Sequence, residues 1–204
     1  MTSLRRLYAI SDASFGDPVR LAQALFDGGA RLVQVRNKKA SARSLFNQVE
    51  SILKRAPADA SVIVNDRVDV ARITGAAGVH LGQSDIGVVE ARRILGPDQI
   101  IGFSTHNLEQ ALAASKLPAD YIAVGPIFPT STKLNAEPVV GLEKLATICK
   151  AVQKPVVAIG GIRLENAAEV LAAGPHSIAV VSDLLSAADI QARVREWINQ
   201  LCCF

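Results

Sequence analysis

Cysteine is scarce in this chain, and its three cysteines are not spaced as metal ligands. Cys149 lies in an apolar helical pattern, while Cys202 and Cys203 are neighbours near the end of the sequence. An odd number of cysteines without ligand spacing argues against both a zinc site and a framework of structural disulfides. This cysteine usage predicts a reducing, cytoplasmic location.

Long apolar runs are also missing. No stretch approaches the roughly 18 residues that a membrane-spanning helix requires. The first ten residues contain two arginines but no apolar segment of the kind found in secretion signals. We therefore expect neither a membrane partner nor an export signal.

Blocks of basic residues are absent, and aromatic residues are few. The formal net charge of +3 is spread along the chain, which has only one Trp, two Tyr and six Phe. Proteins that bind nucleic acid usually carry clustered Lys and Arg, with aromatic side chains that stack on bases. Nucleic acid is therefore not an expected partner, and the sequence leaves the oligomeric state open.

What the chain does contain is a regular alternation of two kinds of segment. Of its 204 residues, half are apolar and one fifth charged, enough for one sizeable core. Short Val- and Ile-rich runs alternate with amphipathic segments, which is the pattern of βα units. The expected strands are Leu7–Ile10, Leu32–Arg36, Val62–Asn65, Gly78–Leu81, Ile100–Ser104, Tyr121–Val124, Val156–Ile159 and Ile178–Val181. The expected helices are Pro18–Phe26, Ala42–Arg55, Val68–Thr74, Val88–Leu95, Leu108–Ser115, Leu142–Ala151, Leu164–Ala172 and Ala187–Gln200.

Eight βα units in about 200 residues fit a closed barrel at the small end of its size range. We therefore predict an α/β fold, a (β/α)8 TIM barrel, in a single domain spanning residues 1–204. The alternative is an open doubly wound sheet, although no glycine fingerprint follows the first strand. Predicted helix starts include Ser41, Asn107 and Ser186, the last with Asp189 in the first turn.

Polar residues gather just after these strands, where the active site of such a barrel lies. They include Gln34, Arg36 and Lys38 after the second strand, Asn65 and Asp66 after the third, His80 and Asp85 after the fourth, Ser104 and His106 after the fifth, and Ser182 after the eighth. These groups should converge on one mouth. His80 could equally be a hydrogen-bonded residue of the barrel interior.

Asp66 and Asp85 follow adjacent strands, whose backbones lie about 4.8 Å apart, so both carboxylates can reach one hard cation. Magnesium suits two carboxylates without cysteine ligands. The alternative is that each acid caps a helix: Asp66 the helix that starts near Arg67, and Asp85 the helix that starts near Val88.

The loop from Gly125 to Lys133 is rich in hydroxyls and ends in an ammonium, which suits a phosphate or pyrophosphate. An ordinary surface connection is the alternative. Arg36, Lys38 and Lys133 would surround a pyrophosphate near the metal. Gly160-Gly161 and Val181-Ser182 suggest a second anion site, because the loops after strands seven and eight often hold phosphate in barrels of this kind.

Seven ordered motifs together resemble the thiamine-phosphate synthase family over almost the whole chain. They are Gln34-x-Arg36-x-Lys38, Val64-Asn65-Asp66-Arg67-Val68-Asp69, Gly78-Val79-His80-Leu81-Gly82-Gln83-x-Asp85, Gly102-x-Ser104-Thr105-His106, Gly125-Pro126-Ile127-Phe128-Pro129-Thr130-x-Thr132-Lys133, Ala158-Ile159-Gly160-Gly161-Ile162 and Ala179-Val180-Val181-Ser182. The resemblance implies a transferase that joins 4-amino-2-methyl-5-hydroxymethylpyrimidine diphosphate to 4-methyl-5-(2-phosphoethyl)thiazole. The products would be thiamine phosphate and pyrophosphate.

The resemblance also implies a role for each matching residue. Asp66 and Asp85 would bind Mg2+. The diphosphate would be held by Arg36, Lys38, Asn65 and Lys133, and the pyrimidine by Gln34. The thiazole phosphate would be held by Thr130, Thr132, Gly161, Val181 and Ser182. Lys133, Ser104, Arg36 and Lys38 would be the catalytic residues.

The chain departs from the family's motifs at Asn37, at Pro175-His176 and at Asp183. The carboxylate of Asp183 could face solvent, or it could weaken binding at the phosphate site. Two other functions remain open. A related thiazole tautomerase shares the barrel and the thiazole-phosphate site but displaces no pyrophosphate, and would not require both acids together with Lys133. The second open alternative is a non-catalytic barrel that binds a phosphorylated metabolite.

Overall fold

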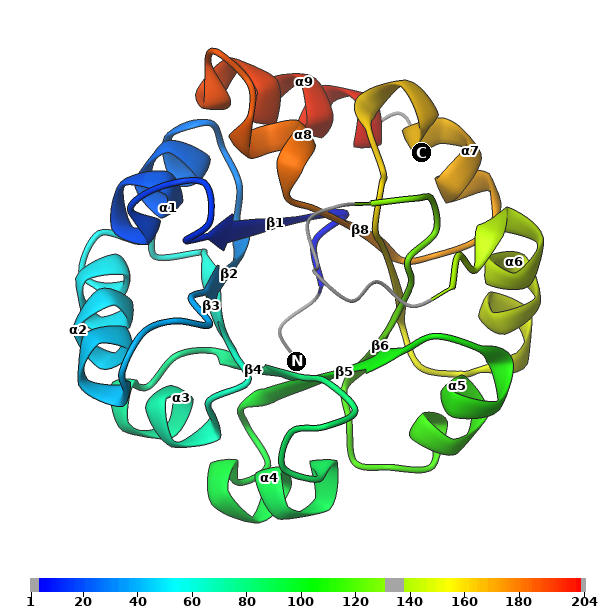
Figure 1. The fold of residues 1–204 in the computed structure, drawn as a ribbon, viewed down its shortest axis with the longest axis horizontal. Helices are drawn as coiled ribbons and strands as arrows, with labels where there is room; N and C mark the ends of the chain where they lie inside the picture. Colours follow the sequence, from blue (N-terminus) through cyan, green and yellow to red (C-terminus); the bar gives the residue numbers. More distant parts are fainter. Residues whose placement is uncertain (1–3, 131–137, 203–204) are drawn as a thin grey trace.

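The computed structural model describes residues 4–130 and 138–202. Eight parallel strands form a closed barrel in chain order, and the last strand pairs with the first (Figure 1). The strands are β1 (Leu7–Asp12), β2 (Leu32–Arg36), β3 (Ser61–Asn65), β4 (Gly78–Leu81), β5 (Ile100–Thr105), β6 (Tyr121–Val124), β7 (Val156–Ile159) and β8 (Ser177–Val180). The predicted TIM barrel is confirmed, and the open doubly wound sheet is wrong.

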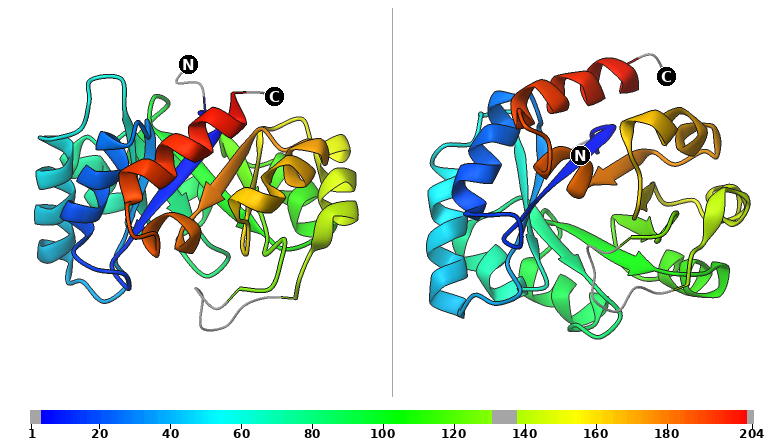
Figure 2. Two further views of the ribbon diagram at one scale, coloured as in Figure 1. Left: turned by 90° about the horizontal axis from the view of Figure 1, so that it is seen from above. Right: turned by 45° about the horizontal axis from the view of Figure 1, so that its top comes forward.

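Helices surround the barrel as an outer ring, which Figure 1 shows in end view and Figure 2 from two further directions. They are α1 (Pro18–Asp27), α2 (Ala42–Leu53), α3 (Val68–Thr74), α4 (Val88–Leu95), α5 (Leu108–Ser115), α6 (Gly141–Ala151), α7 (Ala167–Ala172), α8 (Ser182–Leu185) and α9 (Ile190–Leu201), with a 3-10 turn, η1 (Leu164–Asn166), before α7. In the described ranges, no helix combines the length and the apolar character needed to span a lipid bilayer.

The alternation of side chains along each strand separates two apolar layers. The barrel interior holds a small cluster that includes Tyr8, Ile63 and Tyr121. The larger cluster lies between the outside of the sheet and the helices, and it includes the fully buried Trp197 of α9. The outer layer holds most of the buried apolar side chains, so it supplies most of the hydrophobic stabilisation. In the barrel interior, polar side chains lie beyond this apolar cluster, at the C-terminal ends of the strands.

Two of the predicted helix caps are confirmed. The side chains of Ser41 and Asn107 accept hydrogen bonds from backbone N–H groups in the first turns of α2 and α5. The predicted cap at Ser186 is wrong, because Asp189 accepts from the N–H of Ala192 and caps α9 instead. The expected last helix therefore begins later, after the separate short α8.

Strand boundaries differ from the prediction at both ends of the barrel sequence. β1 continues two residues further than expected, since Ser11 and Asp12 pair with Val35 and Arg36 of β2. β8 ends at Val180, and Ser182 is the first residue of α8 rather than part of a strand end. The longer β1 brings Asp12 to the mouth of the barrel, while Val181 and Ser182 still lie at the mouth as predicted.

Candidate active site

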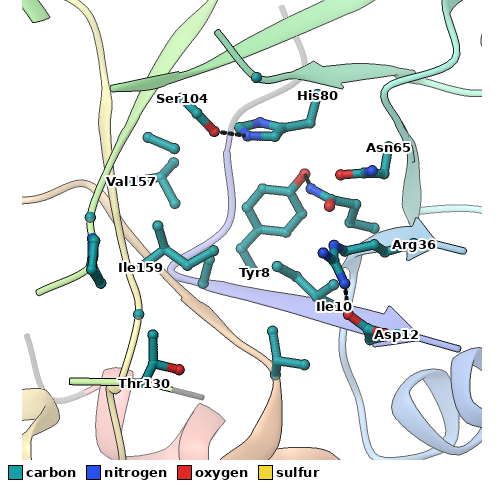
Figure 3. Close-up of a pocket in the computed structure, with 18 of the residues that line it drawn as sticks. Tyr8, Ile10, Asp12, Arg36, Asn65, His80, Ser104, Thr130, Val157 and Ile159 are labelled. Carbon is teal, nitrogen blue, oxygen red and sulfur yellow. Dashed lines mark hydrogen bonds and ion pairs between the residues drawn. The ribbon is translucent and has the colours of Figure 1, made fainter. Parts of the chain in front are cut away.

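A cavity of about 380 Å³ opens at the C-terminal ends of the strands. Of the thirteen predicted site residues, eleven are described, and all of these line the cavity. They are Gln34, Arg36, Lys38, Asn65, Asp66, Asp85, Ser104, Thr130, Gly161, Val181 and Ser182. Figure 3 shows Arg36, Asn65, Ser104 and Thr130 around this space. The other two, Thr132 and Lys133, lie outside the described residues.

Asp66 and Asp85 lie close together at the ends of β3 and β4. The backbone of Asp66 has a φ of 63°, a left-handed conformation, and its N–H donates to the carbonyl of His80. Its Oδ2 lies 3.2 Å from Nζ of Lys38. Oδ2 of Asp85 accepts from the N–H of Gly82 at 2.7 Å.

Neither acid caps a helix. The N-cap positions of α3 and α4 are Arg67 and Gly87, and neither makes a side-chain capping bond. Burial, and then the nearby charge of Asp66, raises the pKa of Asp85 above its usual value. Two hard oxygen donors that repel one another are a fitting donor set for a divalent cation. Within the described residues, no group of three or more His, Cys, Asp or Glu side chains is arranged to hold a metal ion.

Arg36 is held by an acid that the sequence analysis did not select. Asp12, at the end of β1, forms an ion pair with the guanidinium of Arg36, and Figure 3 shows the two side chains meeting. Oδ1 of Asp12 also accepts from the N–H and hydroxyl of Ser14. Asp12 is the last residue of β1, a position from which a side chain can face the mouth of the barrel. The sequence pattern ended the first strand at Ile10, so it did not identify Asp12 as a site residue. Asp12 is almost fully buried, so it fixes the guanidinium at the rim of the cavity.

The loops after β6 and β7 pack closely against one another at Gly160 and Gly161. The N–H of Phe128 donates to the carbonyl of Gly160. Gly161 has a φ of 68°, and a Cβ there would lie 2.6 Å from the carbonyl oxygen of Pro129. Thr130 follows on the same loop and faces the cavity (Figure 3). Gly161, Val181 and Ser182, which were predicted to form a second anion site, therefore line the cavity beside Thr130, at the ends of the neighbouring strands β6, β7 and β8.

The carboxylate of Asp183 points away from this site. It accepts from the indole N–H of Trp197 at 2.7 Å and from the guanidinium of Arg193, both on α9. The side chain of Asn37 is likewise turned outward, donating to Oε1 of Gln48 on α2. These two departures from the family's motifs therefore do not place a new charge or amide against the cavity.

His80 was predicted to lie either at the mouth or, hydrogen-bonded, in the barrel interior. The structure shows both features, because His80 lines the cavity and is hydrogen-bonded within the barrel. Its Nε2 meets the hydroxyl of Ser104, and its Nδ1 meets that of Tyr121. Tyr8 lies beside them in the interior, and neither tyrosine was predicted, because each looks in the sequence like an apolar strand residue. His106 donates from Nδ1 to the carbonyl of Gly125 at 2.6 Å, which fixes its ring at the rim.

This fold and this cavity define a class, the (β/α)8 barrels with a ligand-sized site, lined by polar and apolar side chains, at the C-terminal ends of the strands. Residues 7–184 match the family model described as thiamine monophosphate synthase. The chain belongs to the thiamine monophosphate synthase family.

Relatives support this assignment over most of the chain. A thiamine-phosphate synthase from Koribacter versatilis is 42% identical over 205 residues, covering 97% of this chain and 96% of the relative. One from Chlorobium phaeovibrioides is 48% identical, covering 81% of this chain and 79% of its own length. Both belong to the synthases that the motifs indicated.

Solved structures show the same arrangement. Thiamine phosphate pyrophosphorylase from Pyrococcus furiosus superimposes with a TM-score of 0.89 at 38% identity, covering 96% of this chain and 95% of that one. A 3-hexulose-6-phosphate synthase, with a TM-score of 0.74 at 17% identity over 96% of this chain and 99% of its own, shares the fold alone.

Proposed function

We propose that this protein is a thiamine-phosphate synthase, a transferase that couples 4-amino-2-methyl-5-hydroxymethylpyrimidine diphosphate with 4-methyl-5-(2-phosphoethyl)thiazole. One observation carries the proposal: every predicted site residue that the structure describes lines the same cavity. Full-length relatives of the chain bear the same name. The products would be thiamine phosphate and pyrophosphate.

The diphosphate fits the side of the cavity formed by β2, β3 and β4. Arg36 and Lys38 supply positive charge there, and Asn65 supplies an amide. Asp66 and Asp85 would hold Mg2+, whose charge would help neutralise the diphosphate. Lys38 lies beside Asp66, and its ammonium would contact the same phosphate oxygens.

The thiazole phosphate fits the opposite side, between the loops after β6, β7 and β8. Backbone N–H groups at Gly161, Val181 and Ser182 and the hydroxyl of Thr130 would donate to its oxygens. Asp183 is turned toward α9 and would not repel this phosphate. Binding both substrates in one cavity holds the two reacting atoms together.

The proposed reaction breaks the bond between the pyrimidine methylene carbon and the diphosphate oxygen, and the electron pair leaves with pyrophosphate. The thiazole nitrogen then donates its lone pair to the methylene carbon, forming the new C–N bond. Arg36 and Lys38 would stabilise the charge that grows on the leaving oxygen. Apolar side chains including Ile10, Val157 and Ile159 line the same cavity and would limit competing attack by water (Figure 3).

The test is to incubate the purified protein with both substrates and Mg2+ and to detect thiamine phosphate by mass. EDTA should stop product formation, and excess Mg2+ should restore it. Absence of thiamine phosphate would overturn the proposal, and binding of the thiazole phosphate without pyrophosphate release would favour a tautomerase-like or non-catalytic barrel. Roles for Thr132 and Lys133, a single domain over residues 1–204 and a cytoplasmic location stay predictions.

A further inference from the structure

A continuous chain of four hydrogen bonds crosses the barrel interior from β2 to β5. Its members, in order, are Gln34, Tyr8, Tyr121, His80 and Ser104. The distances are 2.8 Å from Nε2 of Gln34 to the hydroxyl of Tyr8, 2.9 Å between the two tyrosine hydroxyls, 2.9 Å from the hydroxyl of Tyr121 to Nδ1 of His80, and 2.8 Å from Nε2 of His80 to Oγ of Ser104. Figure 3 shows the last of these bonds.

The direction of the chain follows from its first bond. The amide N–H of Gln34 donates to the hydroxyl of Tyr8. The hydrogen of this buried hydroxyl needs an acceptor, and the hydroxyl of Tyr121 lies 2.9 Å away, so Tyr8 donates onward to Tyr121. Tyr121 then donates to Nδ1 of His80. Because Nδ1 accepts, the ring hydrogen of the neutral imidazole is on Nε2, which donates to Ser104.

Two features maintain this direction. Burial raises the pKa of both tyrosines, so each hydroxyl keeps its hydrogen. An imidazolium at His80 would donate from both ring nitrogens. The hydroxyl of Tyr121 would then receive two hydrogens and, among its partners in the described part of the chain, have no acceptor for its own.

We propose that this chain holds His80 as the Nε2–H tautomer and thereby makes Ser104 a hydrogen-bond donor toward the ligand. The hydroxyl of Ser104 accepts from His80, so its own hydrogen is left to point into the cavity, which Ser104 lines. Tyr121 does not line the cavity and is fully buried. It is a positioning residue that acts through His80.

The donor direction matters for the chemistry. On the proposed function, on which this step rests, negative charge grows on the departing diphosphate, and a hydroxyl that donates would stabilise it. Were the chain reversed, with Gln34 accepting from Tyr8, Ser104 would donate to His80 and present only lone pairs to the cavity. The same residues would then oppose the reaction.

The tautomer can be observed without any substrate. In protein labelled with nitrogen-15 histidine at neutral pH, we expect Nδ1 of His80 to show the resonance of an unprotonated ring nitrogen and Nε2 that of a protonated one. The signals are assigned by their loss in His80→Gln. In Tyr121→Phe the two nitrogens should shift toward averaged values. A protonated Nδ1 in the wild-type protein would overturn the proposal.

Ser177→Ala is the matched control for these measurements. Ser177 is a buried strand residue whose hydroxyl donates to the carbonyl of Arg5, away from the cavity. Its loss removes one buried hydrogen bond, whereas Tyr121→Phe removes the two that Tyr121 makes with Tyr8 and His80, and it should leave the His80 resonances and turnover unchanged. If Ser177→Ala moves them equally, the effect of Tyr121→Phe is general destabilisation and the positioning role is wrong.

Turnover provides the second measurement. We expect Tyr121→Phe to lower kcat about tenfold or more, with the KM for the pyrimidine diphosphate little changed, since Tyr121 does not meet the ligand. Adding Tyr121→Phe to Ser104→Ala should cause no further loss, because one acts through the other. Additive losses would overturn the positioning role. If the wild-type protein makes no thiamine phosphate, the proposed function fails while the tautomer measurement stands.

Discussion

The carboxylates of Asp66 and Asp85, at the ends of neighbouring strands, interact directly, and this repulsion adds to burial in raising the pKa of Asp85. The positive charge of Lys38, which pairs with Asp66, offsets part of the rise in the pKa of Asp85. The pair is therefore an unfavourable arrangement in the protein alone and a favourable one around a divalent cation.

Asp85→Asn should raise the melting temperature of the metal-free protein at neutral pH. The amide oxygen can still accept from the N–H of Gly82, while the partly buried charge is removed. Because the folded-state pKa is raised, wild-type Asp85 is destabilising above that pKa, and the penalty fades as the pH falls toward about 3.9, the ordinary value. The gain from Asp85→Asn should fade over the same range, as measured by melting in EDTA buffers. A gain that is constant with pH would contradict this account.

The same variant should lose its response to metal. We expect Mg2+ to raise the melting temperature of the wild-type protein and to leave that of Asp85→Asn unchanged, with turnover reduced about 100-fold or more. Asp17→Asn is the control, since Asp17 is an exposed N-cap and asparagine caps a helix equally well. Equal stabilisation of Asp85→Asn and the wild-type protein by Mg2+ would show that the metal binds elsewhere.

Asp183→Ala should lower the free energy of unfolding by about 2 kcal/mol without changing the KM for the thiazole phosphate. It removes the acceptor for the indole of Trp197 and a buried partner of Arg193. Glu196→Ala removes an exposed partner of the same arginine and should cost under about 0.5 kcal/mol. Urea unfolding and substrate kinetics measure the two effects. A large rise in KM would mean that Asp183 affects the phosphate site after all.

The fold, and the gathering of the candidate site residues at one cavity, were predictable because both depend on order along the chain. Eight apolar runs, each followed by a helix, specify a closed barrel, and the barrel brings every strand end to one mouth. Asp66, Asp85 and Gly161 could therefore be assigned to the same cavity from sequence position alone.

The residues that were missed depend on contacts that position does not reveal. Asp12 was missed because the predicted end of the first strand was two residues too early. Tyr8 and Tyr121 are 113 residues apart, and their hydroxyls meet only because alternate residues of β1 and β6 point into the barrel. Their pairing depends on Gly102, because a side chain at residue 102 would occupy the space of the Tyr121 ring. The sequence does not show this contact, since residues 102 and 121 are far apart in the chain.

Gly102→Ala tests that dependence. A Cβ at residue 102 would lie 2.0 Å from Cζ of Tyr121, so the ring would have to move. We expect a loss of about 3 kcal/mol in the free energy of unfolding from overpacking, and a strong loss of turnover. Gly75→Ala is the control, since a Cβ there meets nothing within 4 Å and only the left-handed φ costs about 1 kcal/mol. Retention of full turnover in Gly102→Ala would show that Tyr121 need not stay in place.

Gly161→Ala tests the second anion site. Its φ is 68°, and a Cβ would lie 2.6 Å from the carbonyl of Pro129 and 2.8 Å from that of Phe128, so the loops after β6 and β7 would be forced apart. Thr130 lies on the displaced loop. We expect the KM for the thiazole phosphate to rise about tenfold or more, since a misplaced donor loses its hydrogen bond to phosphate.

The affinity for the pyrimidine diphosphate separates this effect from general damage. That substrate is assigned to the opposite side of the cavity, so Gly161→Ala should leave its binding within about twofold of the wild-type value, as measured by calorimetry with Mg2+ and without thiazole. Gly75→Ala again serves as the control for left-handed strain away from the cavity. If both substrates weaken equally, the loops after β6 and β7 hold the whole cavity in shape. If only the pyrimidine diphosphate weakens, the two anion sites have been assigned to the wrong sides.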